Sequence, residues 1–133
     1  MAEEKMLWRN AKRQGSIAEY LFATEAMRQG FGLLMPLGDY LPYDCILDFE
    51  GNLFRVQVKS TAHRDGSCYH FKTCSGHNAK TLYDQRSFDA YAFNIFGTEH
   101  FYFFGIHEIA TVSYRVHLHH DIDRLNNWDF FRE

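Results

Sequence analysis

The sequence YDCILDFEGNLFRVQVK, at residues 43–59, contains two strand-like runs on either side of Gly51 and Asn52. These two residue types tolerate the positive φ angles of a tight turn, so the stretch predicts an antiparallel β-hairpin. With Gly51 and Asn52 as the turn, antiparallel pairing places Asp44 directly opposite Lys59. Side-chain origins at opposed positions of neighbouring strands are about 5 Å apart, so these two side chains are expected to meet.

Side chains alternate between the two faces of a strand, and this hairpin sorts them by polarity. One face is apolar and comprises Cys45, Leu47, Phe49, Phe54, Val56 and Val58. The other face is polar apart from Ile46 and Leu53, and comprises Asp44, Asp48, Glu50, Arg55, Gln57 and Lys59. We therefore expect the hairpin to cover a hydrophobic core with one face and to collect charge on the other.

The rest of the chain predicts a helix and several further strands. Ser16 and Glu19 form a capping-box pattern before apolar residues at helical spacing, which predicts a helix at residues 16–29, with 6–13 as an extension towards the N-terminus. Strand-like runs occupy residues 31–35, 67–72, 87–96, 101–106 and 111–118, and a short helix is expected within 121–131. The predicted fold class is α+β, with a central mixed β-sheet flanked by helices.

Length and composition indicate one packed domain at residues 1–133. Apolar residues make up 46% of the 133 residues, and no apolar run is long enough for a membrane-spanning helix. The three cysteines lack C-x-x-C spacing, which favours neither a disulfide framework nor a zinc knuckle. We expect a soluble cytoplasmic protein with no membrane partner. The net charge of −3 argues against binding nucleic acid through bulk charge alone.

The polar face of the hairpin has the residue types of a divalent-metal site. Asp44 offers a carboxylate, Gln57 an amide oxygen and Val58 a backbone carbonyl, which are hard oxygen ligands of the kind that Mg²⁺ accepts. Phosphodiester hydrolysis needs such an ion, a nucleophilic water and a cationic group nearby. Lys59 is expected to orient the attacking water or help to deprotonate it, and to stabilise negative charge in the transition state.

These residues resemble the signature of the PD-(D/E)XK nuclease superfamily. The resemblance rests on LPYD at residues 41–44, twelve intervening residues, and QVKST at 57–61. It looks closest to the small branch that contains group I intron homing endonucleases and archaeal-type Holliday junction resolvases. GSIAE at residues 15–19 resembles the first-helix motif, and residues 88–90 and 101–103 resemble later core strands of that branch.

The resemblance implies a restriction-endonuclease-like fold and a metal-dependent DNA endonuclease that uses Mg²⁺, with Mn²⁺ as a substitute. It adds Glu19 to the catalytic and metal-binding residues Asp44 and Gln57. The implied substrate is double-stranded DNA or a DNA junction, and the implied assembly is a homodimer or homotetramer. Gln57 departs from the motif, because a neutral amide stands where the second acid is usual and should weaken metal binding. A catalytically inactive nuclease-fold module that binds DNA or a protein therefore remains an alternative.

Other residues allow competing interpretations. Asp44 and Lys59 could form an ordinary exposed ion pair, and Glu19 could be satisfied as a capping-box residue. A transition-metal site is a weaker alternative, and its candidate ligands are His100, His107, His117, His119, His120, Asp121 and Asp123. The basic N-terminus and residues 83–86 could contact phosphates, residues 101–104 are expected to be core, and Cys45 is expected to be a buried thiol.

Overall fold

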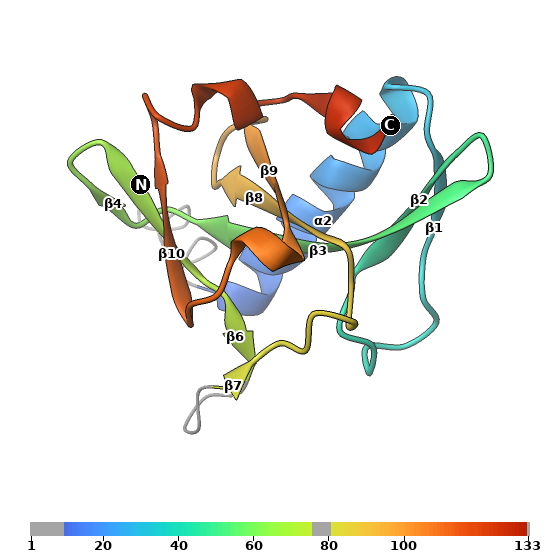
Figure 1. Cartoon of the computed structure of the whole chain (residues 1–133), viewed down its shortest axis with the longest axis horizontal. Coiled ribbons are helices and arrows are strands. Elements are labelled where there is room, and N and C mark those ends of the chain that lie inside the picture. Colours follow the sequence, from blue (N-terminus) through green and yellow to red (C-terminus); the bar gives the residue numbers. More distant parts are fainter. Residues whose placement is uncertain (1–9, 76–80, 133) are drawn as a thin grey trace.

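The central sheet has five strands in the order β1-β2-β3-β8-β9 (Figure 1). The computed structural model describes residues 10–75 and 81–132. The five strands are β1 (Gly32–Leu34), β2 (Cys45–Phe49), β3 (Asn52–Thr61), β8 (Ala90–Ile95) and β9 (Phe101–Gly105). β3 and β8 are parallel and the other neighbours are antiparallel, which confirms the predicted mixed sheet.

The long helix α2 (Ala11–Arg28) begins earlier than the capping-box pattern predicts. Asn10 is its N-cap, because the Asn10 side chain accepts a hydrogen bond from the backbone N–H of Arg13 at 3.1 Å. The predicted start at Ser16 was therefore wrong, the predicted extension over 6–13 is confirmed from Ala11 onwards, and Glu19 lies in the helix interior. A capping-box role for Glu19 is excluded by this placement, so its carboxyl group needs another partner.

Strands β8 and β9 of the central sheet are buried on both faces. On one face, α2 and the C-terminal 3-10 turn η3 (Trp128–Phe131) pack against the sheet, and α2 crosses behind the strands in Figure 1. This first core contains Phe22, Leu47, Val56, Val58, Phe101, Phe103, Trp128 and Phe131. The second core lies on the opposite face and contains Phe71, Phe88, Tyr91, Phe93, Tyr102, Phe104 and Val116. Residues 101–104 are core, as predicted, because β9 supplies alternate side chains to both layers.

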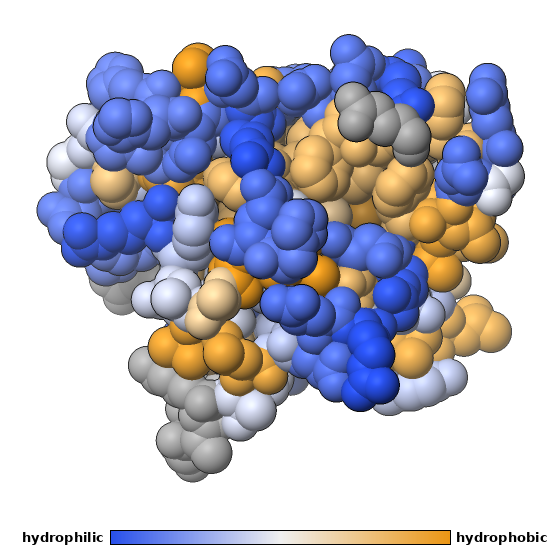
Figure 2. Space-filling view, in the orientation of Figure 1, coloured by the Kyte–Doolittle hydropathy of each residue, from blue (hydrophilic) through white to orange (hydrophobic). Residues whose placement is uncertain are grey.

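A three-stranded sheet in the order β10-β5-β4 borders the second core. Its strands are β4 (Arg64–Asp65), β5 (Cys68–Lys72) and β10 (Ser113–His117), so two of the predicted strands are confirmed. Figure 2 shows mostly hydrophilic side chains over β4 and β10 at the left of the view. β6 (Cys74–Ser75) and β7 (Thr81–Leu82) pair separately, and η1 (Ile106–Glu108) and η2 (Ile122–Arg124) are short 3-10 turns. The predicted helix at 121–131 is thus two 3-10 turns.

No helix within residues 10–75 and 81–132 is long and apolar enough to cross a membrane.

The hairpin of β2 and β3 has the predicted faces but a different register. Phe49 pairs with Asn52, so the two-residue turn is Glu50-Gly51 and not Gly51-Asn52. Both turn residues have positive φ, 52° for Glu50 and 89° for Gly51, which is typical of a type I′ hairpin turn with glycine in the second place. The Asp48 carboxylate accepts a hydrogen bond from the Gly51 N–H at 2.9 Å and stabilises this turn.

The shift in register is two residues, which is one full period of a strand. An even shift keeps every side chain on its predicted face, and the apolar residues of both strands do pack against α2. It changes which residues are opposed, because the end of β2 now brings Asp44 beside Gln57 and not Lys59. The prediction that Asp44 lies opposite Lys59 was therefore wrong.

Candidate active site

Asp44 lies directly before β2 and is hydrogen-bonded to the middle of β3. The Asp44 N–H donates to the Val56 carbonyl at 2.9 Å, and the Val58 N–H donates to Asp44 Oδ2 at 2.7 Å. These two bonds bracket Gln57, the residue between them on β3. At this position the Asp44 carboxylate, and not a backbone carbonyl, accepts the hydrogen bond from the Val58 N–H. This bond fixes the Asp44 side chain against the strand that carries Gln57 and Lys59.

Glu19 reaches the same place from helix α2. Its carboxyl group comes close to that of Asp44, and a hydrogen bond between the two acids raises the pKa of Glu19 and so favours a proton on Glu19. Burial, the largest cause, together with the hydrogen bond and negative charge of Asp44, raises the pKa of Glu19 to about 8. Two carboxyl groups that converge in this way form an arrangement typical of acid pairs that share a cation or a proton.

The same pair of acids affects the pKa of the neighbouring Cys45 thiol. Burial, the largest cause, together with the charges of Asp44 and Glu19, raises the pKa of Cys45 to about 12. The thiol therefore stays protonated at neutral pH and is a poor nucleophile. The expectation of a buried, unreactive Cys45 agrees with its 3% exposure.

The raised pKa of Glu19 predicts that stability falls as the pH rises in the absence of a divalent metal. An unfolded glutamate has a pKa near 4.5, so the folded chain binds one proton more than the unfolded chain between about pH 4.5 and 8. The free energy of unfolding should therefore decrease across this window. Urea unfolding in EDTA at several pH values measures it, and Glu19→Gln should remove this part of the slope. An identical slope in wild type and variant would contradict the prediction.

Gln57 has a buried oxygen with no partner. Among the residues that the structure describes, Gln57 Oε1 is one of two buried side-chain polar atoms without a hydrogen bond. A buried acceptor left unsatisfied costs about 1–3 kcal/mol, so such an atom requires an explanation. It lies on the residue that the Asp44 hydrogen bonds bracket, and an amide oxygen is a suitable ligand for a hard cation.

Lys59 is held by an aromatic residue that the sequence did not connect with it. Its ammonium group lies 3.4 Å from the Tyr83 hydroxyl and 5.5 Å from the centre of the Tyr83 ring. Tyr83 in turn packs edge-on against Phe88, with ring centres 5.2 Å apart. The Lys59 side chain is half-buried, on the polar face of β3, and does not enter either core. Strand alternation predicts this face for Lys59, but no sequence pattern indicates the contact with Tyr83.

The donor set fits a hard divalent cation. Glu19 and Asp44 supply carboxylate oxygens, Gln57 supplies an unpartnered amide oxygen, and the predicted Val58 carbonyl belongs to the residue whose N–H binds Asp44. Mg²⁺ prefers oxygen ligands and retains several waters, so a site with few protein ligands suits it. A bound cation would also replace the proton between the two acids.

The histidines do not form the alternative transition-metal site. No group of three or more His, Cys, Asp or Glu side chains suited to a metal is found in the described parts of the chain. His117 Nδ1 instead accepts hydrogen bonds from the N–H groups of His119 and His120, and Asp121 accepts one from the His117 N–H. These residues stabilise the turn after β10. The basic N-terminal residues 1–9 lie outside the described residues.

Residues 84–86 make internal contacts. Asp84 accepts hydrogen bonds from the side chain and backbone of Arg86, which hold the pKa of Asp84 down at about 2. The Arg86 carbonyl accepts a hydrogen bond from Arg55 at 2.8 Å, and Arg55 also pairs with Asp89. This network fixes the entry into β8, next to Tyr83.

Comparison with known proteins places this geometry in a family. The sequence profile of the PD-(D/E)XK endonuclease family matches residues 9–129. The chain belongs to the PD-(D/E)XK endonuclease family. Its fold resembles that of a bacterial homing endonuclease, I-Ssp6803I, with a TM-score of 0.72 and 28% sequence identity over 80% of this chain and 78% of that one. A search of curated proteins found no significant match.

Membership of the PD-(D/E)XK endonuclease family and the likeness to a homing endonuclease confirm the predicted resemblance and the predicted mixed α+β fold. They support a nuclease of the endonuclease type. The neutral Gln57 remains a departure from the family's acidic motif position. The side chain of Gln57 has a buried oxygen without a hydrogen-bond partner. Gln57 is next to Val58 on β3, and the Val58 N–H donates to the Asp44 carboxylate.

Proposed function

We propose that this protein is a metal-dependent endonuclease that hydrolyses phosphodiester bonds in double-stranded DNA, in the manner of a homing endonuclease. The single observation that carries the proposal is the acid pair of Glu19 and Asp44, in which Asp44 is hydrogen-bonded to Val56 and Val58, the two neighbours of Gln57 and its unpartnered oxygen. An ordinary surface ion pair would need neither a shared proton nor an empty buried acceptor. Membership of a nuclease family and a homing endonuclease neighbour support the reaction class.

Glu19, Asp44, Gln57 and the Val58 carbonyl would hold Mg²⁺, with Mn²⁺ as a substitute. When bound, the ion would neutralise charge on the phosphate oxygens and lower the pKa of a coordinated water. The protein's own contribution is to orient these oxygens. The hydrogen bond from the Val58 N–H fixes the Asp44 carboxylate against β3, and burial of the Gln57 oxygen removes competing water.

Lys59 would act on the water and on the developing charge. In the hydrolysis, the water oxygen forms a bond to phosphorus, the bond from phosphorus to the leaving sugar oxygen breaks, and a proton passes to solvent. An ammonium group near the water can orient it and stabilise negative charge on the phosphate. The Tyr83 hydroxyl and ring limit the positions of the Lys59 ammonium group, so Tyr83 is a positioning residue in this proposal.

One such site cuts one strand. Cleavage of a duplex on both strands therefore requires two copies of the chain, which favours a homodimer or homotetramer on DNA. The net charge of −3 fits a protein that contacts DNA through a local surface and not through its overall field.

Plasmid nicking tests the proposal. The purified wild-type chain should convert supercoiled plasmid to nicked and linear forms in Mg²⁺ or Mn²⁺, and EDTA should stop the reaction. Asp123→Asn is a matched control for an Asp44→Asn variant. Asp123 is an exposed acid on η2 that is not part of the proposed site. DNA binding without cleavage in either metal would contradict the proposal and favour a non-catalytic nuclease-fold module.

Gln57→Glu should bind Mg²⁺ at least as tightly as the wild type. The substitution adds a third carboxylate to those of Glu19 and Asp44 at the position of a neutral ligand, and a cation site gains affinity with ligand charge. Isothermal titration calorimetry of both proteins with Mg²⁺ measures the difference. A weaker Mg²⁺ affinity in Gln57→Glu would count against Gln57 as a ligand.

A further inference from the structure

A pocket of about 320 Å³ lies at the end of β3, beyond the acid pair. Lys59, Ser60 and Thr61 of β3 form one side, and β5 contributes His70 and Lys72. Lys59 thus belongs both to the proposed active site and to this pocket. A ligand in the pocket would lie directly beside any phosphate that Lys59 contacts.

The charge of the pocket has one sign. None of the described residues that line it is acidic, and two of them are lysines. The Lys72 side chain is exposed, and its ammonium group has no ion pair or hydrogen bond with the side chain of another described residue. Ser113 lies opposite Lys72 on β10 and adds a hydroxyl donor to the same wall.

Two histidines form a flat side of the pocket. The rings of His63 and His70 are stacked, with centres 4.8 Å apart and planes at 18°. His70 Nε2 is 3.6 Å from Asp65 Oδ2, too long for a hydrogen bond, and no other partner satisfies it among the described residues. Asp65 also pairs with Arg115 at 3.4 Å, so its negative charge is shared between Arg115 and His70.

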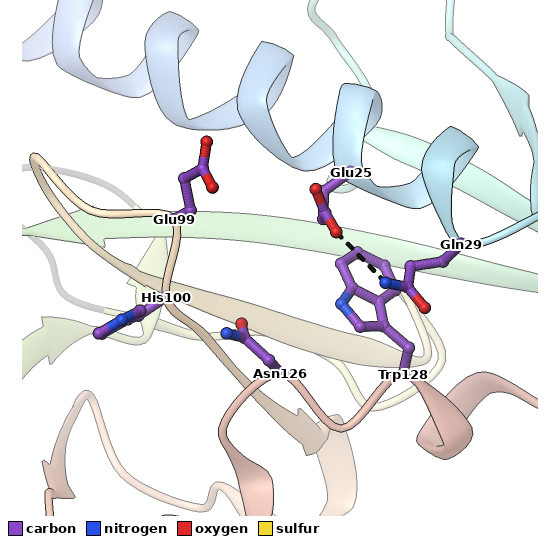
Figure 3. Close-up of a pocket in the computed structure, with 6 residues that line it drawn as sticks. All are labelled: Glu25, Gln29, Glu99, His100, Asn126 and Trp128. Carbon is purple, nitrogen blue, oxygen red and sulfur yellow. Dashed lines mark hydrogen bonds between the residues drawn. The ribbon is translucent and has the colours of Figure 1, made fainter.

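A second cavity shows that this charge is specific to one side of the molecule. A pocket of about 490 Å³ lies between α2, the β8–β9 turn and the chain before η3. Its lining includes Glu25 and Glu99, and Figure 3 shows Glu25 on the helix above Trp128 and Glu99 on a separate turn next to His100. An anion would be repelled there. Of the two cavities, only the one beside Lys59 suits a phosphate.

We propose that the pocket between β3 and β5 binds a backbone phosphate of DNA adjacent to the phosphate that is cut, with Lys72 as its principal contact. The proposal rests on the proposed function for the identity of the neighbouring phosphate. A DNA strand carries one charge per about 3.4 Å of helix axis, so a strand with one phosphate at Lys59 brings the next phosphate into this region. Lysines and hydroxyl groups are common phosphate donors and read no base sequence.

Salt-dependent DNA binding tests the pocket without any need for cleavage. The measurement is fluorescence anisotropy of a labelled DNA duplex in EDTA over a series of salt concentrations. Lys72→Gln should reduce the slope of log K against log salt by about 1 and weaken binding about threefold or more. Lys72→Arg keeps the charge and should keep the slope. Arg28→Gln removes one exposed positive charge at the far end of α2 and should leave the slope unchanged.

The outcomes separate the pocket from the nuclease. An unchanged slope in Lys72→Gln, or an equal change in Lys72→Gln and Arg28→Gln, would overturn the phosphate pocket even if the wild type nicks plasmid. A reduced slope in Lys72→Gln alone, with no nicking by the wild type in Mg²⁺, would support the pocket and overturn the nuclease. A wild-type chain that neither binds the duplex nor nicks plasmid would overturn both.

Discussion

Lys59→Ala should lower the rate of plasmid nicking by about 10²–10⁴-fold and leave the affinity for Mg²⁺ nearly unchanged. Loss of one group that stabilises transition-state charge or assists proton transfer has effects of this size. Lys59 is a cation, so it cannot be a metal ligand and its removal does not take a ligand from the site. Single-turnover nicking and calorimetry with Mg²⁺ measure the two quantities separately.

Asp44→Asn is the second variant, and it tests the metal-binding role of Asp44. Asparagine keeps an oxygen that can accept the hydrogen bond from the Val58 N–H, and removes the negative charge beside Glu19. Both Mg²⁺ binding and nicking should fall, nicking by at least about 100-fold, because even residues behind the ligands have effects of 10–100-fold. Asp44→Asn with wild-type activity, or Lys59→Ala with lost metal binding, would contradict the assigned roles.

Phe22→Ala should lower the free energy of unfolding by about 3–5 kcal/mol. Phe22 is fully buried on α2. The centre of its ring lies 5.5 Å from the ring centre of Phe101, 6.3 Å from that of Phe103 and 5.3 Å from that of Trp128. The substitution opens a cavity between the helix and the sheet and removes these ring contacts. Urea unfolding followed by tryptophan fluorescence measures the loss, and Trp128 reports directly on this core.

Tyr20→Ala is the control for Phe22→Ala. Tyr20 is on the same helix but is 67% exposed, so its loss should change the free energy of unfolding by no more than about 0.5 kcal/mol. Equal effects of the two substitutions would mean that burial against the central sheet does not decide the stability of α2. Because α2 carries Glu19, the Phe22→Ala variant should also lose nicking activity at temperatures where the wild type keeps it.

The sequence predicts the fold of this protein well where apolar periodicity is strong. The strands at residues 87–96 and 101–106 and the faces of the hairpin follow directly from runs of apolar residues. The turn was misplaced by one residue because glycine and asparagine both suit positive φ, and Glu50 at φ 52° is an uncommon occupant of such a turn. The helix start was missed because Asn10 and Ser16 are both good N-cap residues.

The candidate site was partly predictable for the same reason. Motif spacing identifies Asp44, Gln57 and Lys59, since an even error in register leaves them on one face. Spacing cannot show that Glu19 shares a proton with Asp44, because this contact joins a helix to a strand and depends on packing. The contact of Tyr83 with Lys59 bridges 24 positions of sequence, and no local pattern encodes it.

The turn at Glu50-Gly51 also constrains how this protein can change in length. Insertion of a single residue into β3 between the turn and Gln57 would rotate every later side chain to the opposite side of the ribbon. Val56 and Val58 would then lie on the polar face of the hairpin, and Gln57 and Lys59 would face helix α2. Evolution can therefore lengthen or shorten this segment in pairs of residues, or through a bulge that absorbs the odd one, without inverting the chemistry that it carries.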